Sequence, residues 1–459
     1  MKFKRIKKLH FVGIGGVGMS GIAEILFNSG YEISGSDLRK NDASEFLKSI
    51  GIEINYGHSE SNINGSDVVI ISSAVGEANV EVKEARRQKI TVISRAEMLA
   101  ELMRMKISIA VAGTHGKTTT TSMIGHLLKE GSLDPTVIVG GRVIGVGSNS
   151  YLGKSDYLIA EADEFDRSIT RFYPTISVIT SLEPEHMECY EDFNDLENCF
   201  IEFANRVPFY GSAILCIDEE GVRNIESRIT RPIITYGLSS DAQFRAANID
   251  YFDGGIKFTL YHNQKRVTDV QTNVQGEHNL KNMLAAFAVA YDLEVPLESI
   301  VPAANTFHGV SRRMELAGEV NGIRFYDDYG HHPTEIQTTI KGLRTVFDGR
   351  IIAVFQPHLY SRTQRFYEDF GESFNDADKA VILDVFPARE KPIDGISGKL
   401  IVDVAVKSGH KGVEYIEDKE KLPNYLSSIV EPGDRVILFG AGDINRYTKK
   451  IIELMKDKS

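Results

Sequence analysis

Residues 106–123 read KISIAVAGTHGKTTTTSM, and this stretch decides the fold of the middle of the chain. A short apolar run with β-branched residues leads into a glycine-framed lysine, and a helical pattern follows directly. Strand–loop–helix units of this kind build parallel sheets that are covered by helices. The stretch therefore predicts an α/β domain with a glycine loop at the carboxyl edge of its sheet.

The loop itself has the parts that a bound triphosphate requires. These are inward-facing backbone N–H groups, a helix N-terminus, a cation for the phosphate oxygens and a hydroxyl for a metal ion. The general pattern has a glycine where this chain has Val111, so the loop is a shortened variant. A simple turn with a solvated lysine is the alternative. We expect ATP to bind at Gly113, Thr114, His115, Gly116, Lys117, Thr118 and Thr119.

An acidic segment, DYLIAEADEFD at 156–166, follows further along the chain. Its carboxylates lie at and after the end of an apolar strand, where a Mg²⁺ ligand for a bound triphosphate is expected. An acidic surface turn is the alternative for any one of them. The candidates are Glu161, Asp163, Glu164 and Asp166.

A second glycine loop, FVGIGGVGMSG at 11–21, stands near the start of the chain. Gly13, Gly15 and Gly18 satisfy the dinucleotide pattern GxGxxG, and Asp37 follows at the spacing of a carboxylate that binds a ribose or a base. Alone, this loop suggests NAD. Because a second loop for ATP is present, a diphosphate-linked substrate such as a UDP-sugar fits better.

Alternating apolar runs and helical patterns continue to the end of the chain and predict three α/β domains. We expect a Rossmann-like domain at 1–106, a central domain at 107–310 and a second Rossmann-like domain at 311–459. Between about 240 and 275 the pattern changes to alternating runs with turn signals, which predicts an antiparallel patch in the central domain.

Composition excludes some classes of function. Lys and Arg total 52 against 64 Asp and Glu, a net charge of −12, which disfavours nucleic acid as a partner. Cys189, Cys199 and Cys216 lack metal-ligand spacing and indicate ordinary thiols of the cytoplasm. The chain has no apolar run long enough for a membrane span, and it carries no signal for an oligomeric state.

Nine motifs together resemble the Mur ligases of bacterial cell-wall synthesis, over nearly the whole chain and in the family's order. They are HFVGIGGVGMSGIAEIL, GTHGKTTTT, EADEFD, EHMECY, GEHNLKNMLAA, SRRMELAGE, YDDYGHHPTEI, QPHLYSRT and FGAGDI. The resemblance implies three domains that bind a UDP-sugar, ATP and an amino acid. It further implies ligation of L-alanine to the carboxylate of UDP-N-acetylmuramate through an acyl phosphate, with ATP and two Mg²⁺ ions.

The resemblance also implies roles for individual residues. Thr118, Glu161 and His186 resemble the metal ligands, and Asn279 with Asn282 resembles the pair that reads adenine. The expected substrate site comprises Gly13, Gly15, Gly16, Val17, Gly18, Asp37, Ser72, Tyr329, His331 and Arg362. The expected catalytic residues are Lys117, His186, Arg313, His331, His358 and Arg362, and Arg313 and Asp328 also belong to the ATP site.

Less specific interpretations stay open for several of these residues. His186 taken alone reads as a surface histidine, Asn279 as a helix cap, and HHP at 331–333 as a turn before a helix that begins at Pro333. An NAD-dependent oxidoreductase, a P-loop ATPase and a nucleotide-binding regulator are the competing classes. Within the family, a ligase that adds a whole tripeptide is the nearest alternative.

Overall fold

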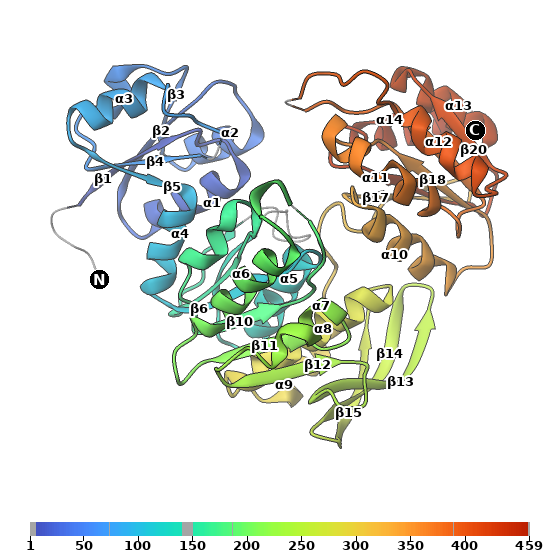
Figure 1. Cartoon of the computed structure of the whole chain (residues 1–459), viewed down its shortest axis with the longest axis horizontal. Helices are drawn as coiled ribbons and strands as arrows, with labels where there is room; N and C mark the ends of the chain where they lie inside the picture. Colours follow the sequence, from blue (N-terminus) through green and yellow to red (C-terminus); the bar gives the residue numbers. More distant parts are fainter. Residues whose placement is uncertain (1–5, 73, 140–149, 186, 389, 458–459) are drawn as a thin grey trace. The chain divides into compact units, whose positions relative to one another are not determined.

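The computed structural model describes residues 6–72, 74–139, 150–185, 187–388 and 390–457. The chain forms two compact units. Unit 1 comprises Met1–Asn248, Phe258–Gln271 and Lys281–Phe307, and unit 2 comprises Ile249–Lys257, Thr272–Leu280 and His308–Ser459. Three sheets follow one another along the chain, drawn in blue, in cyan to yellow and in orange to red in Figure 1. The predicted α/β fold is confirmed.

The first sheet is parallel throughout, with the strand order β3-β2-β1-β4-β5. The order reverses between β1 and β4, and ligands of open α/β sheets bind outside the strand ends at such a point. Its strands are β1 (Lys8–Val12), β2 (Glu32–Asp37), β3 (Glu53–Tyr56), β4 (Val68–Ile71) and β5 (Thr91–Ser94). Its helices are α1 (Val17–Asn28), α2 (Asp42–Ser49), η1 (Glu60–Ile63), α3 (Val80–Arg87) and α4 (Arg95–Arg104).

The second sheet has ten strands in the order β15-β14-β13-β12-β11-β10-β6-β9-β7-β8. The strands are β6 (Ile107–Ala112), β7 (Thr136–Ile138), β8 (Ser150–Tyr151), β9 (Tyr157–Glu161), β10 (Ile176–Ile179), β11 (Ser212–Cys216), β12 (Ile233–Gly237), β13 (Phe244–Phe252), β14 (Gly255–His262) and β15 (Lys265–Thr272). The helices are α5 (Lys117–Glu130), η2 (Phe165–Arg171), η3 (Met187–Cys189), α6 (Phe193–Asn205), α7 (Glu220–Glu226), α8 (Glu277–Asp292) and α9 (Leu297–Ala304).

The antiparallel patch predicted near 240–275 is present at one edge of this sheet. Two-residue loops at 253–254 and 263–264 join β13, β14 and β15, which are neighbours in the sheet and must therefore run antiparallel. Gly254, Asn263 and Gln264 take positive φ, as tight hairpin turns require.

The third sheet has the order β16-β17-β21-β18-β19-β20 and is parallel apart from β16. Its strands are β16 (Glu315–Val320), β17 (Ile323–Asp328), β18 (Ile351–Phe355), β19 (Lys379–Leu383), β20 (Val413–Ile416) and β21 (Arg435–Phe439). Its helices are α10 (Pro333–Arg344), α11 (Tyr360–Glu372), α12 (Gly398–Lys407), η4 (Lys419–Lys421), α13 (Leu422–Ile429) and α14 (Asn445–Asp457).

The third sheet is buried on both faces, which explains its nearly continuous apolar strands. On β18, Ile352 and Val354 pack into one apolar cluster, whereas Ile351, Ala353 and Phe355 pack into another. Successive side chains of a strand point to opposite faces, so each cluster covers one face of the sheet.

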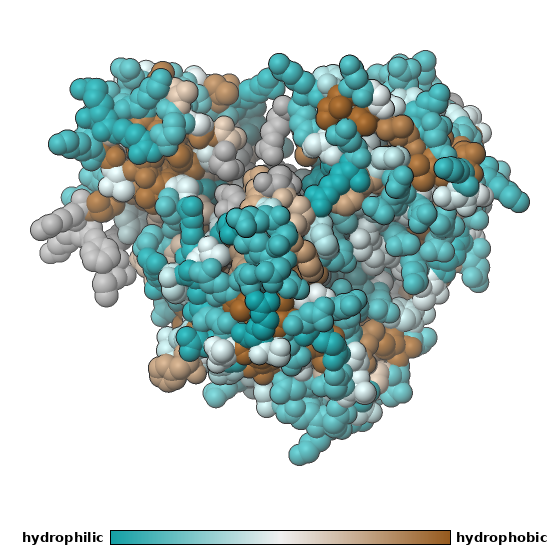
Figure 2. All heavy atoms as spheres, in the orientation of Figure 1, coloured by the Kyte–Doolittle hydropathy of each residue, from teal (hydrophilic) through white to brown (hydrophobic). Residues whose placement is uncertain are grey.

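Local signals set several helix starts near the strand ends. Ser94 and Glu97 form a capping box that begins α4, and Pro333 stands at the first turn of α10, as predicted. On the face drawn in Figure 2 most side chains are hydrophilic, in keeping with a chain in which 25% of residues are charged. Every helix in the described ranges is too short or too polar to cross a bilayer.

Candidate active site

The loop between β6 and α5 can be built only with glycines at two positions. Gly113 has φ +140, and a Cβ there would stand 2.1 Å from Thr180 Oγ1 and 2.9 Å from the backbone nitrogen of Ser181. Gly116 has φ +82 and caps α5 in the left-handed conformation. These glycines let the backbone turn sharply, so that the N-terminus of α5 faces the loop. A helix N-terminus in this position can bind a phosphate group.

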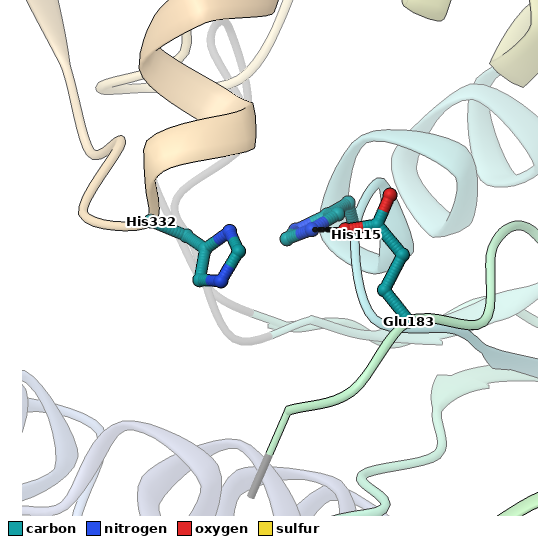
Figure 3. A group of neighbouring side chains, drawn as sticks. All are labelled: His115, Glu183 and His332. Carbon is teal, nitrogen blue, oxygen red and sulfur yellow. Dashed lines mark hydrogen bonds and ion pairs between the residues drawn. The ribbon is translucent and has the colours of Figure 1, made fainter. Parts of the chain in front are cut away.

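The segment that follows β10 braces this loop. Ser181 Oγ accepts a hydrogen bond from the N–H of His115 at 2.8 Å, and Thr180 Oγ1 donates to the carbonyl of His115 at 2.5 Å. Thr114 Oγ1 accepts from the N–H of Glu183 at 2.9 Å. Figure 3 shows the adjoining contact, in which His115 Nε2 lies 3.3 Å from the Glu183 carboxylate. No motif in the sequence indicates this brace.

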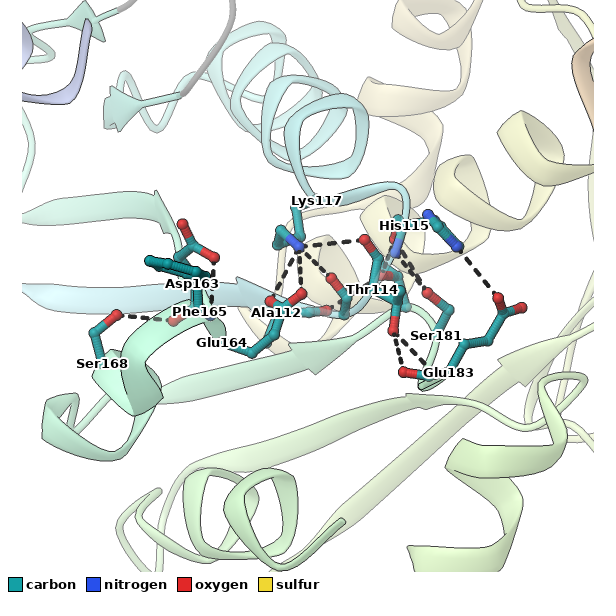
Figure 4. Close-up of polar contacts among 12 residues, drawn as sticks. Ala112, Thr114, His115, Lys117, Asp163, Glu164, Phe165, Ser168, Ser181 and Glu183 are labelled. Carbon is teal, nitrogen blue, oxygen red and sulfur yellow. Dashed lines mark hydrogen bonds and ion pairs between the residues drawn. The ribbon is translucent and has the colours of Figure 1, made fainter. Parts of the chain in front are cut away.

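Lys117, the first residue of α5, is turned back onto its own loop. Figure 4 shows its ammonium pointing at Glu164, with Nζ at 2.9 and 3.0 Å from the two carboxylate oxygens. Burial alone would lower the pKa of Lys117, but the carboxylates of Glu164, Asp163 and Glu185 raise it above its usual value. Lys117 is therefore a cation at the mouth of the loop.

Two of the three predicted metal ligands lie at this mouth. Glu161 ends β9 and pairs in register with Val111, one strand away from the start of the loop, and Thr118 stands in the first turn of α5 with Thr119 next to it. A carboxylate and a hydroxyl are oxygen donors of the kind Mg²⁺ prefers. His186 lies outside the described residues, so its role stays a prediction.

Asn282 on α8 lies against the loop. An ideal Cβ on Gly116 would come within 2.8 Å of Asn282 Oδ1, so the amide side chain fills the space that glycine leaves. Asn279 precedes it by one turn of the same helix, and its side chain donates to the carbonyl of Gln275 at 2.9 Å. Asn279 lies inside α8, which begins at Glu277, so it is not the N-cap residue.

The first glycine loop lies at the carboxyl ends of β1, β2 and β4. Gly13 has φ +81, and its ideal Cβ would lie 3.0 Å from Ser72 Cβ, in the segment after β4. Asp37, the last residue of β2, accepts a hydrogen bond from the N–H of Gly15 at 2.9 Å. Asn41 donates to the carbonyl of Gly15 at 3.1 Å. The predicted substrate residues Gly13, Gly15, Asp37 and Ser72 are thus close together.

The remaining residues of that loop begin α1. Gly16 is the N-cap, Val17 begins the helix and Gly18 lies in its first turn. An ideal Cβ on Gly18 would be 3.1 Å from Arg95 Nη1, so the guanidinium of Arg95 packs against the start of α1. A helix N-terminus with a nearby cation suits a pyrophosphate.

In unit 2, Arg313, Asp328 and Tyr329 gather at the end of β17. Asp328 is buried and accepts from the N–H groups of Met314 at 2.8 Å and Gly330 at 2.7 Å. The guanidinium of Arg313 lies 5.6 Å from the centre of the Tyr329 ring and 3.1 Å from a carboxylate oxygen of Glu335.

The two predicted histidines of unit 2 lie next to this group. The ring of His331 is 5.4 Å from that of Tyr329 and 6.5 Å from that of His358, which stacks on Phe386. Arg362 stands in the first turn of α11, which begins two residues after His358. The carboxyl edge of the third sheet therefore brings together Arg313, Tyr329, His331 and His358, and α11, which carries Arg362, begins beside them.

Two neighbouring carboxyl groups on β17 have pKa values above the ordinary value of an aspartate. Burial raises the pKa of Asp328 to about 6, although the charge of Arg313 opposes the shift. Burial likewise raises the pKa of Asp327 to about 6, against the charge of Arg312. Arg312 and Asp327 were not singled out from the sequence, although Arg312 lies in the motif SRRMELAGE and Asp327 in YDDYGHHPTEI.

Each group of residues has its own chemical capacity. Both glycine loops of unit 1 offer backbone N–H groups at a helix start, and the loop at 113–116 adds a lysine, a hydroxyl and a carboxylate. These additional groups are the parts that phosphoryl transfer needs beyond phosphate binding. The group in unit 2 can bind an anion and accept a proton through imidazole.

Comparison with protein families identifies the class. Three family models match in succession: "Mur ligase family, catalytic domain" at residues 8–107, "Mur ligase middle domain" at 111–290 and "Mur ligase, glutamate ligase domain" at 312–442. The chain belongs to the Mur ligase family.

Individual relatives narrow the comparison. The chain is 45% identical to UDP-N-acetylmuramate--L-alanine ligase of Geotalea daltonii, with 99% of each chain covered, and 46% identical to the Salinibacter ruber enzyme of that name, with 99% and 96% covered. The crystal structure of UDP-N-acetylmuramate-alanine ligase MurC from Thermotoga maritima matches with a TM-score of 0.82 at 28% identity, covering 98% and 100%. A murein peptide ligase from Psychrobacter arcticus shares the fold, with a TM-score of 0.71 at 23% identity and 98% coverage of both chains.

Proposed function

We propose that this protein joins L-alanine to the carboxylate of UDP-N-acetylmuramate at the expense of ATP, in the synthesis of peptidoglycan precursors. The observation that carries the proposal is full-length identity of 45% to a curated alanine ligase, on a chain whose loop at 113–118 has the parts of an ATP site. Such an activity serves cell-wall formation and hence cell shape and division.

The reaction has two steps. The carboxylate oxygen of the sugar acid attacks the γ-phosphorus of ATP, the bond to the β-phosphate oxygen breaks, and ADP leaves. The neutral amine of L-alanine then attacks the carbonyl carbon of the acyl phosphate, and the C–O bond breaks to release phosphate. Phosphorylation is needed because a free carboxylate has no adequate leaving group. No covalent bond to the protein is required.

Charge stabilisation in the first step falls to Lys117 and Arg313 in this proposal. Negative charge spreads over the equatorial oxygens of the migrating phosphoryl group, and fixed cations lower the barrier. Lys117 has the position for this role because it stands at the N-terminus of α5 beside the loop carbonyls. Asn279 and Asn282 would read adenine, and Asp328 would contact the ribose.

Thr118, Glu161 and His186 would hold Mg²⁺, and we propose two ions. When it is bound, magnesium neutralises negative charge on the phosphate groups. The oxygen donors Thr118 and Glu161 fit this ion, and both lie at the mouth of the ATP loop.

The second step needs a base for the alanine amine. His331 and His358 are the candidates, since imidazole titrates near neutral pH and their rings lie 6.5 Å apart. Tyr329 and Arg362 would receive the carboxylates of alanine and of the sugar. The glycine loop at 13–18, with Asp37 and Ser72, would bind the UDP moiety.

The domain partition and the location of the protein belong to the same proposal. We assign residues 1–106 to the UDP-sugar, 107–310 to ATP and 311–459 to the amino acid, each domain having one of the three sheets. A cytoplasmic location fits free nucleotide substrates and reduced Cys189, Cys199 and Cys216.

A ligase that attaches a whole tripeptide is the second candidate, because a murein peptide ligase shares the fold. The relatives named as alanine ligases, at up to 46% identity over the full chain, favour alanine. Phosphate release is measured with UDP-N-acetylmuramate, MgATP and, in turn, L-alanine, L-serine, glycine or the tripeptide. We expect alanine to give the highest kcat/KM and omission of the sugar to stop release. Preference for the tripeptide, or ATP hydrolysis without the sugar, contradicts the proposal.

A further inference from the structure

The ammonium of Lys117 is already fully occupied by the protein itself. Its Nζ lies 2.9 and 3.0 Å from the two oxygens of Glu164, 2.5 Å from the carbonyl oxygen of Gly113 and 3.3 Å from that of Thr114 (Figure 4). An ammonium has three N–H donors, so these three residues can take all of them. A phosphate that binds here must therefore displace one of the acceptors.

Glu164 is held firmly in place. Its side chain is 1% exposed, and its carbonyl accepts a hydrogen bond from the hydroxyl of Tyr190 at 2.5 Å. The preceding residue, Asp163, accepts from the N–H of Phe165 at 3.2 Å and, through its carbonyl, from Ser168 Oγ at 2.8 Å. The turn that begins η2 therefore fixes the carboxylate opposite Lys117.

The acceptor that competes most strongly with a phosphate is Glu164. Its bond to Lys117 joins two opposite charges, whereas Gly113 and Thr114 offer neutral carbonyls. A buried carboxylate also repels an incoming triphosphate, because like charges interact strongly where water is scarce. Asp163 and Glu185 add charge of the same sign near Lys117.

We propose that Glu164 is a positioning residue that holds Lys117 on the loop and makes its release depend on a divalent cation carried by the nucleotide. This inference rests on the proposed function, which puts ATP at this loop. A triphosphate that carries a metal ion brings less net negative charge to Glu164 than a bare triphosphate does. The pair thus discriminates against metal-free nucleotides and keeps the half-buried lysine paired before ATP binds.

Calorimetric titration of the full chain tests the proposal. ATP is titrated once with excess Mg²⁺ and once with EDTA, into wild type and into Glu164→Gln. We expect Glu164→Gln to bind metal-free ATP about tenfold more tightly and to change MgATP affinity by less than about threefold. Glu164→Asp keeps the charge, so its affinity for metal-free ATP should stay as weak as in wild type.

A matched control is available in the third sheet. Lys379, at the amino end of β19, and Glu414 on β20 form another lysine–glutamate pair at 2.6 Å. Glu414→Gln should leave the affinities for both forms of ATP unchanged. Tighter binding of metal-free ATP by Glu414→Gln, as is expected for Glu164→Gln, contradicts a specific role for Glu164.

A second pair of variants keeps the proposal testable if Glu164→Gln does not fold, since that change leaves a half-buried lysine without its charge partner. Lys117→Gln and the double variant Lys117→Gln with Glu164→Gln are compared in the EDTA titration. The double variant should bind metal-free ATP about tenfold more tightly than Lys117→Gln, because only the single variant retains the repelling carboxylate. Equal affinities overturn the proposal.

The possible outcomes separate this inference from the proposed function. If the wild-type protein binds neither form of ATP, the assignment of ATP to the loop at 113–118 is wrong. If Glu164→Gln weakens MgATP and leaves metal-free ATP unchanged, Glu164 is a metal ligand and the inference fails. Equal changes for both forms also overturn it, because a merely structural role does not distinguish them.

Discussion

The two glycine loops of unit 1, at 13–18 and 113–116, follow the same strand–loop–helix plan but differ in what their carboxylates bind. In the first loop the carboxylate of Asp37 accepts from a backbone N–H, that of Gly15. In the second loop the carboxylate of Glu164 binds the side chain of Lys117. The first carboxylate fixes the backbone of a loop, and the second fixes a side-chain cation.

In the proposed function, this difference separates a loop that binds phosphate from a loop at which phosphoryl transfer takes place. A helix N-terminus is sufficient to hold a phosphate group, and both loops have one. Transfer of a phosphoryl group also needs a fixed cation where charge develops. The glycines of a loop therefore show only that it can bind phosphate. Whether the loop can also support phosphoryl transfer depends on the charged side chains next to the glycines.

The largest effect is expected from Lys117→Ala. Removal of the one loop lysine should lower the ligation rate about 1000-fold, because a preorganised charge opposite the migrating phosphoryl group is lost. Affinity for UDP-N-acetylmuramate should change by less than about twofold, since that ligand is assigned to the other loop. ADP release and calorimetry measure the two quantities. Exposed Lys83 on α3 provides the control variant Lys83→Ala, and an unimpaired Lys117→Ala enzyme contradicts the comparison.

Substitution of alanine for Gly113 in one loop and for Gly15 in the other should lower the free energy of unfolding by different amounts. At Gly113, with φ +140, a Cβ would stand 2.1 Å from Thr180 Oγ1, so Gly113→Ala should lower the free energy of unfolding by about 3 kcal/mol. At Gly15 the obstacles are side-chain atoms of Asn41 and Asp37 at 2.7 and 2.8 Å, which can move, so about 1 kcal/mol is expected.

Urea unfolding measures both glycine variants. Gly76→Ala is the control, since nothing lies within 4 Å of its ideal Cβ, and it should change stability by less than about 0.5 kcal/mol. If Gly15→Ala proves as damaging as Gly113→Ala, the backbone of the first loop is as constrained as that of the second.

Asp327→Asn extends the comparison to a buried carboxylate in the third sheet. The pKa of Asp327 is raised to about 6 from an ordinary value of 3.8, so the folded state binds more protons than the unfolded state between these values. The stabilising contribution is present below pH 4 and is lost as the pH rises through 6. Relative to wild type, Asp327→Asn should therefore gain about 2 kcal/mol between pH 4 and 7.

Chemical unfolding at several pH values measures how the stability difference between Asp327→Asn and wild type changes with pH. Glu53→Gln, at an exposed position on β3, is the control and should show no change of slope relative to wild type. A constant difference between Asp327→Asn and wild type from pH 4 to 7 contradicts a raised pKa for Asp327.

A smaller effect than that of Lys117→Ala is expected from Asp37→Ala. Loss of the carboxylate frees the N–H of Gly15 and loosens the loop, so KM for UDP-N-acetylmuramate should rise about tenfold, with kcat reduced by less than about twofold. MgATP affinity should stay the same. Initial-rate kinetics decide, with Glu53→Ala as control, and a fall in kcat without a change in KM argues against a binding role for the first loop.

Local patterns predicted the fold and the loops well for a physical reason. Gly113, Gly116 and Lys117 act through the backbone and the first turn of one helix, so their spacing in sequence is their spacing in space. The antiparallel patch was predicted because alternation and turn residues are likewise local, as at Asn263 and Gln264.

The partners of the loop residues could not be predicted in the same way. Glu164 was recognised only as one of several acidic residues, and its pairing with Lys117 joins positions 47 residues apart. The brace of His115 by Thr180 and Ser181 depends on β10 lying next to β6, which no local motif encodes. The roles assigned to the individual site residues, that of His186 among them, stay predictions.

The central claim is that the loop at 113–118 transfers the γ-phosphoryl group of ATP to the carboxylate of the sugar acid. UDP-N-acetylmuramate labelled with ¹⁸O in that carboxylate tests it directly, with L-alanine, MgATP and mass spectrometry of the released phosphate. The account predicts that each phosphate carries one oxygen from the labelled carboxylate, because the acyl phosphate breaks at its C–O bond. Amide formation with no label in the phosphate contradicts it.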